Sequence, residues 1–306
     1  MDESKILEKL KENYDDKILG IDFFRDSGGT TYIVNGEKQK FFIKIAGKAF
    51  QDTIRQSVDI VRYLTRKGFP VPAIIETKSG MPMLETHDEG QEYLLDLYEY
   101  IDGKEPDLCA CAEKVGELVG QLHKLLLDYK GTLVERDYQF FIERYVEILR
   151  RKNYPFADTY ADLGAKFWDR VKDCPVGVCH GDLHRGNLLE TADGRIYLLD
   201  FDTICVAPRM FDVAVMCDMT DYFNLQIADI RTTREVYEKF LAGYVHHINL
   251  SEAEQASFND WIVVRHFQLQ ATIVEVFGMD CIDNDFVNRQ LQWIKSWEEQ
   301  LPYSLD

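Results

Sequence analysis

The residues best suited to chemistry lie in one short stretch, residues 176–204, which is predicted to be a β insertion among helices. Asp182 stands in a glycine-flanked loop, and Asn187 follows five residues later. Asp200 and Asp202 come after a second apolar run. Carboxylate and amide side chains grouped in this way suit metal binding and proton transfer. This stretch is therefore the first candidate for an active site.

The Asp193-Gly194 pair lies between the two apolar runs and predicts a tight hairpin. If these two residues form the turn, Asn187 lies directly opposite Asp200, with Cβ atoms roughly 4.5–5.5 Å apart. An amide oxygen and a carboxylate at that separation suit Mg²⁺, which takes one or two protein oxygens together with substrate phosphates. Asp182 would then reach a substrate hydroxyl beside the metal.

Two motifs in this stretch closely resemble the signature of the aminoglycoside phosphotransferase and choline kinase family. They are His180-Gly181-Asp182-Leu183-His184-Arg185-Gly186-Asn187 and Leu199-Asp200-Phe201-Asp202. The family has a protein-kinase-like fold, so the resemblance implies an α+β, two-lobed chain. It also implies that Asp182 is the catalytic aspartate, that Asn187 and Asp200 bind Mg²⁺, and that the γ-phosphoryl group of ATP passes to a small-molecule hydroxyl.

Further pieces resemble the nucleotide-binding elements of the same family and follow in the order that its fold requires. Ser27, Gly28 and Gly29 resemble the loop over the phosphates, where small residues let backbone N–H groups approach oxygen atoms. Lys44 matches the strand lysine that pairs with the α- and β-phosphates. Glu99 and Ile101 lie in the run that resembles the hinge, whose backbone groups would bind adenine.

Asp212 fits the position of an aspartate that caps a helix and braces the catalytic loop. The resemblance spans roughly residues 18–217.

One position departs from the family pattern. Family members usually carry a Glu on the first helix that pairs with the strand lysine, and the matching residue here is Ser57. Ser57 lies at the centre of the apolar face of the predicted helix Gln51–Arg66, whereas Asp52 and Asp59 lie on the opposite face. A water or another acid would then orient Lys44, unless the helix phase differs or catalysis is impaired.

The elements that must position these residues fall into two parts. Strand-like runs at residues 18–24, 31–34, 40–45, 73–76 and 93–98, with the one helix, predict a small antiparallel sheet. Long helical patterns follow from about Ile101. We therefore expect an N-terminal nucleotide-binding lobe at 1–98 and a helical lobe at 99–306 that carries the catalytic loop and the acceptor site.

The net charge of the chain indicates which kinds of ligand it can bind. The chain has 35 Lys and Arg against 53 Asp and Glu, a net charge of −18, which argues against a nucleic-acid ligand. Residues 1–98 carry a net −3 and residues 99–306 a net −15. This imbalance favours a cationic acceptor or else reflects solubility alone. An aminoglycoside, a choline-like amine, an amino alcohol and a sugar all remain open as acceptors.

An acidic and aromatic wall after residue 220 would suit such an acceptor. Its candidate members are Trp261, His266, Gln270, Glu275, Asp280, Asp283 and Asp285.

The charged N-terminus and the lack of a long apolar run predict a cytoplasmic protein with no membrane partner. Seven scattered cysteines indicate reduced thiols.

Two alternatives remain open. His180, Asp182, His184 and the two later aspartates are residue types found in metallohydrolase sites, although that function leaves Lys44 unexplained. A nucleotide-binding regulatory protein with little turnover is favoured only by Ser57.

Overall fold

The computed structural model describes residues 1–26, 29–47, 51–225 and 229–301. These residues form two compact units. The first is Met1–Pro106 with Gly186–Ile204, and the second is Asp107–Arg185 with the residues from Cys205 on. Asn187 and Asp200 therefore belong to the first unit, and Asp182 belongs to the second. The boundary expected after residue 98 stays a prediction.

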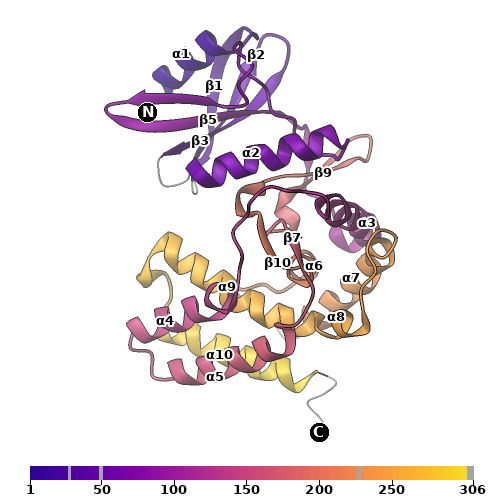
Figure 1. Cartoon of the computed structure of the whole chain (residues 1–306). Coiled ribbons are helices and arrows are strands. Elements are labelled where there is room, and N and C mark those ends of the chain that lie inside the picture. The colour runs from indigo at the N-terminus through magenta and orange to yellow at the C-terminus, as the bar shows by residue number, and fades with distance from the viewer. Residues whose placement is uncertain (27–28, 48–50, 226–228, 302–306) are drawn as a thin grey trace. The chain divides into compact units, whose positions relative to one another are not determined.

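The first unit combines one helix on each side of a sheet with a small β hairpin (Figure 1). Its elements are α1 (Glu3–Asn13), β1 (Ile18–Asp26), β2 (Thr30–Gly36), β3 (Lys40–Gly47), α2 (Gln51–Arg66), β4 (Leu84–Asp88), β5 (Gln91–Glu99), β6 (Gly103–Lys104), β8 (Leu188–Thr191) and β9 (Ile196–Leu198). β1 to β5 form an antiparallel sheet in the order β1-β2-β3-β5-β4, and β6-β8-β9 form a second sheet.

Alternation along β3 and β5 divides the large sheet into two faces. Ile43 and Leu97 point to one face, where they pack in a core with Ile6 and Leu10 of α1. The other face is covered by α2, whose Val58 packs with residues of β3 and β5 in a second core. This second face also carries Lys44 and Asp96, which the register places directly opposite each other.

Two parts of this unit differ from the prediction. The strand expected at residues 73–76 is absent from the described chain there except for a single bridge from Ile74, and β4 at Leu84–Asp88 occupies the edge of the sheet instead. Helix α1 was not predicted, because only Ile6 and Leu10 of this charged segment are buried and two residues do not establish a helical period.

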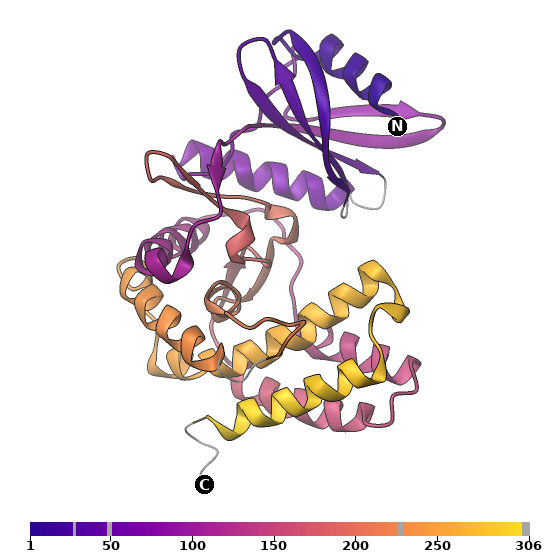
Figure 2. The same cartoon turned by 180° about the vertical axis from the view of Figure 1, so that it is seen from behind.

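The second unit is mostly helical (Figure 2). Its elements are α3 (Leu108–Leu126), α4 (Arg144–Arg151), α5 (Ala157–Val171), β7 (Val176–Cys179), β10 (Cys205–Pro208), α6 (Met210–Cys217), α7 (Asp229–Tyr244), α8 (Glu252–Ala256), α9 (Phe258–Phe277) and α10 (Asn284–Glu299). β7 and β10 pair antiparallel. The small antiparallel sheet of one unit and the helices of the other confirm the predicted α+β class. Among the described helices, none has the length and apolar character needed to span a membrane.

Helix α9 lies at the centre of the second unit and is buried along most of its length. Its Trp261 packs edge-on against Phe141 at 5.6 Å between ring centroids, and Phe141 contacts Phe211 of α6 at 4.9 Å. This aromatic core fixes α6 and α9 relative to each other, and these two helices carry polar residues of the candidate site.

Glycine allows α3 and α7 to approach each other backbone to backbone. A Cβ atom at Gly116 of α3 would lie 1.9 Å from the carbonyl oxygen of Phe240, and one at Gly243 of α7 would lie 2.0 Å from that of Glu113. No side chain fits at either distance, so the contact requires glycine on both helices.

We expect Gly116→Ala to destabilise the protein by about 3 kcal/mol or more, because the added methyl group meets backbone rather than a movable side chain. Urea denaturation would measure the change. Gly20→Ala is the control, because no heavy atom lies within 4 Å of a Cβ at that position. Equal stabilities of the two variants would contradict the close approach.

Candidate active site

A cavity of about 310 Å³ lies within the first unit, between the sheet and the β8–β9 hairpin. Five of the residues predicted from the sequence line it: Lys44, Glu99, Ile101, Asn187 and Asp200. They come from segments up to 156 residues apart in the chain. The structure therefore brings the predicted hinge, strand lysine and metal ligands together around one space.

Lys44 is the electrostatic centre of this cavity. Its Nζ lies 2.7 Å from Asp200 Oδ1 and 3.0 Å from Asp202 Oδ2, and its side chain is 14% exposed. Burial alone would lower the pKa of Lys44, but the carboxylates of Asp200 and Asp202 outweigh burial and raise it. The amine is therefore charged at neutral pH. Asp200 also pairs with Arg25 at 3.5 Å.

The hairpin that carries the predicted metal ligands has a different register from the one expected. Leu188 pairs with Leu198, and the backbone N–H of Leu199 donates to the carbonyl of Asn187 at 2.9 Å. Asn187 is therefore opposite Leu199 rather than Asp200. The prediction assumed a two-residue turn, whereas the loop here has three residues.

The three-residue loop closes because Gly194 takes a positive φ of 82°. The N–H of Thr191 donates to the carbonyl of Arg195 at 2.9 Å, which leaves residues 192–194 outside the ladder. A left-handed glycine at the last position is typical of such hairpins.

Asp200 leaves the strand conformation directly after the hairpin. Its φ of 63° lies in the left-handed region, which costs a residue other than glycine energy but which Asp tolerates better than most. This backbone turn, and not a facing pair in the ladder, brings the carboxylate to the same cavity as Asn187. One amide oxygen and one carboxylate form a donor set that fits Mg²⁺.

A second, fully buried acid lies beside this cavity. Asp96 of β5 is directly opposite Lys44 in the register and is 0% exposed. Burial raises the pKa of Asp96 to about 7, although Lys44 acts in the other direction. The hydroxyl of Tyr98 lies beside the Asp96 carboxylate and helps to lower the pKa of Asp96, but it does not offset burial.

The phosphate loop lies only partly within the described residues. Ser27 and Gly28 fall outside them. A Cβ atom at Gly29 would lie 3.2 Å from the carbonyl oxygen of Ile45, so the chain passes close to β3 at this position. The predicted role of this loop stays a prediction.

Asp182 belongs to the second unit, where a buried arginine holds it. Arg265 of α9 donates to Asp182 Oδ1 at 2.9 Å and to the side chain of Gln268. The Arg265 side chain is 7% exposed. Since a charged guanidinium fixes the geometry of a carboxylate that it contacts, Arg265 orients Asp182.

The loop before Asp182 is braced by Asp212 of α6, as the resemblance implied. Asp212 accepts the backbone N–H groups of His180 at 2.6 Å and of Gly181 at 3.0 Å. Its side chain does not cap α6, which begins after Arg209 without a side-chain cap, so that part of the prediction was wrong.

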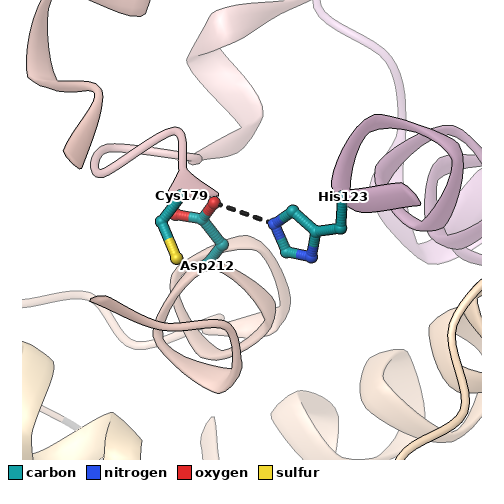
Figure 3. A group of neighbouring side chains, drawn as sticks. All are labelled: His123, Cys179 and Asp212. Carbon is teal, nitrogen blue, oxygen red and sulfur yellow. Dashed lines mark hydrogen bonds and ion pairs between the residues drawn. The ribbon is translucent and has the colours of Figure 1, made fainter. Parts of the chain in front are cut away.

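His123 and Cys179 lie beside Asp212, and the three could be mistaken for a metal site because their ligand atoms lie within 4.8 Å of one another (Figure 3). His123 contacts Asp212 at 3.1 Å through Nε2 and the Tyr244 hydroxyl at 2.7 Å through Nδ1. Burial raises the pKa of Cys179, which keeps the thiol protonated. Burial opposes ionisation of Asp212, but the hydrogen bond from His123 helps to hold its pKa below the ordinary value. The cluster is therefore a structural brace.

Much of the acceptor wall expected after residue 220 is core. Trp261 and His266 are fully buried and Gln270 is 1% exposed, because α9 is surrounded by other helices. Glu275 pairs with Arg144 at 2.7 Å. Asp283 accepts the N–H of Phe286 at the start of α10. The prediction that Trp261 and His266 line an acceptor wall was therefore wrong, because both side chains are buried in the core.

Two residues of the site were not found from the sequence. Asp96 carries a visible signal, because it is a lone acid within the apolar run of β5. Arg265 carries none, because its contact with Asp182 joins residues 83 positions apart.

The model of the phosphotransferase enzyme family matches residues 24–250 of this chain. The match covers well over half of the sequence, and the chain belongs to this family. The family resemblance predicted from the two motifs is thereby confirmed.

Relatives and solved structures agree with this placement. The chain covers 36% of a Deinococcus radiodurans protein, at 30% identity over 132 residues (40% of this chain). It covers 58% of a homoserine kinase from Methylobacillus flagellatus, at 22% identity over 191 residues (61% of this chain). The amicoumacin kinase hAmiN superposes with a TM-score of 0.78 at 21% identity, covering 99% of this chain and 95% of its own. A microcompartment-associated aminopropanol kinase gives 0.71 at 16% identity, covering 96% and 95%. The fold is thus that of the protein-kinase-like phosphotransferases.

Asp96 makes the stability of the protein depend on pH. Its pKa is raised in the folded state from the ordinary 3.8 to about 7, so the stability that it contributes is complete below pH 3.8 and is lost as the pH rises to 7. Relative to Asp96→Asn, the free energy of unfolding of the wild type should fall over this range by roughly a few kcal/mol and then level off. Urea denaturation of the ligand-free proteins at pH 4.5, 6, 7 and 8 measures the difference, and parallel pH profiles would contradict the shift.

Proposed function

We propose that this protein is a kinase that transfers the γ-phosphoryl group of ATP to a hydroxyl of a small, cationic acceptor. The observation that carries the proposal is the gathering of Lys44, Asn187 and Asp200 around one cavity in a chain of the phosphotransferase family. Most of the barrier in this reaction is lowered by positioning and charge stabilisation, which these residue types supply.

The nucleotide would occupy the cavity of the first unit. Lys44 binds the α- and β-phosphates, and the backbone groups of Glu99 and Ile101 bind adenine. Asn187 and Asp200 would hold Mg²⁺, whose charge neutralises the phosphate oxygens. Lys44 exchanges its contact with Asp200 for phosphate when the nucleotide binds, which lets that carboxylate act as a ligand.

Asp182 acts on the acceptor. Its carboxylate orients the hydroxyl and takes the proton late in a loose transition state, as the oxygen–phosphorus bond forms. Arg265 fixes the Oδ1 side of the carboxylate, and the brace at Asp212 fixes the loop that precedes it. The Asp182 side chain therefore loses little conformational freedom when the acceptor binds.

The net charge of −15 on residues 99–306 supports a cationic acceptor. Aminopropanol, for which one similar protein is named, carries an amine near a hydroxyl and is cationic. Homoserine, for which another is named, has the same two groups but also a carboxylate, so it is a zwitterion. A panel of amino alcohols, hydroxy amino acids, choline, aminoglycosides and neutral sugars, assayed for ADP release, identifies the class. Nucleotide binding without ADP release from any acceptor would instead support the regulatory alternative.

Asp182→Asn should lower kcat by about 10²–10⁴-fold with the best acceptor, because a positioned base is lost. Its affinity for ATP should stay close to that of the wild type. Steady-state kinetics and nucleotide titration separate the two effects, with exposed Asp162→Asn as the matched control. Full activity in Asp182→Asn would show that Asp182 is not the catalytic base.

A cationic acceptor should lose kcat/KM as salt rises, because exposed charges are screened over a Debye length of about 8 Å at physiological ionic strength. Measuring kcat/KM for the best acceptor between 20 and 500 mM salt, at saturating ATP, tests this expectation. A neutral sugar of the same panel provides the flat reference. If the best acceptor is neutral or anionic, the prediction of a cationic acceptor is wrong and the charge imbalance serves solubility alone.

A further inference from the structure

Lys44 has no acidic partner on helix α2. The side chain at the position that matches the family glutamate is Ser57, which is 1% exposed and lines the cavity. The two acids of the helix, Asp52 and Asp59, are exposed. In this structure the lysine instead contacts Asp200 and Asp202.

These contacts cannot all persist during the proposed reaction. Asp200 is a proposed metal ligand, and a carboxylate that binds a divalent cation interacts less with a neighbouring ammonium group. Lys44 would then turn from Asp200 toward the phosphates. A flexible lysine needs a remaining acid to keep it aimed at them.

Asp96 is already in place for this role. It lies directly opposite Lys44 on the same face of the sheet, at a spacing of roughly 4.5–5.5 Å between Cβ atoms for such a pair. It is 0% exposed, and the polar groups beside its carboxylate include the Lys44 ammonium and the Tyr98 hydroxyl. Burying an acid in this way destabilises the fold, which indicates that Asp96 has a functional role beside Lys44.

We infer that Asp96 is the positioning residue that holds Lys44 on the phosphates of bound ATP, in place of the missing acid on α2. The inference rests on the proposed function, because it assigns Lys44 to ATP and Asp200 to the metal. The fixed carboxylate of β5 then does from the strand what a helix carboxylate does in related chains. Tyr98, two residues further along the same face, lies near both Asp96 and Ser57 at the back of the cavity.

Asp202 is the competing candidate. Its Oδ2 contacts Lys44 at 3.0 Å, and its side chain is 28% exposed. Asp202 follows Asp200 by two residues in the same turn, so a metal at Asp200 acts on it as well. Asp96 stands instead on β5, whose position does not depend on the conformation of the turn that carries Asp200 and Asp202.

The test measures the Kd for Mg·ATP of Asp96→Asn by calorimetry at pH 8, together with thermal unfolding of the ligand-free protein. We expect the Kd to rise by roughly tenfold to a hundredfold, as is usual when the partner that orients a ligating group is removed. The melting temperature without ligand should stay equal or rise, because a buried acid is removed. A merely structural residue would lower the melting temperature and leave the Kd unchanged.

Two further variants sharpen the result. Glu92→Gln removes an exposed charge from the same strand and should bind Mg·ATP as the wild type does. Ser57→Glu in the Asp96→Asn background restores an acid from the side of α2 and should regain most of the affinity. Wild-type affinity in a folded Asp96→Asn protein would overturn the inference, above all if Asp202→Asn alone weakens binding. Failure of the wild type itself to bind Mg·ATP would instead overturn the proposed function.

Discussion

The first unit is organised around one buried lysine among carboxylates. Lys44 lies within 3.0 Å of oxygens of both Asp200 and Asp202, and Asp96 is buried directly opposite it. Charges removed from water are costly unless they are paired, so the segments that carry these four residues must keep their relative positions. The two apolar cores, under α1 and under α2, supply that rigidity. ATP would replace part of this arrangement with its own phosphates and metal.

In the second unit, a buried and fully hydrogen-bonded carboxylate likewise fixes the loop before Asp182. Asp212 is fully buried, and it is satisfied by His123 and by two backbone N–H groups of the loop. Because its hydrogen bonds come from separate segments, the loop cannot shift without leaving a buried charge unpaired. Arg265 then fixes Asp182 itself from α9. Rigid elements thus hold the proposed base, which suits a reaction that depends on positioning.

Local sequence patterns predicted much of this structure. Helix α2 has the bounds that its apolar period indicated, and the motifs placed Asn187 and Asp200 at one cavity. The hairpin register was wrong by one residue, because Asp-Gly fits a two-residue turn and also the end of a three-residue loop. Asp96 is visible as a lone acid in an apolar strand, but it was missed because the sequence does not show that β5 pairs with β3 and sets Asp96 opposite Lys44. Arg265 could not be predicted, since no local rule reports a contact between residues 83 apart.

The most direct test is calorimetric titration of ATP into the ligand-free protein and into Lys44→Met, with Mg²⁺ and with EDTA. The wild type should bind Mg·ATP more tightly than metal-free ATP, and Lys44→Met should lose most of the affinity. Saturation of the wild type at 100 times the Kd should add about 2.7 kcal/mol to its stability. No heat and no stabilisation with any nucleotide would contradict the assignment of this cavity to ATP.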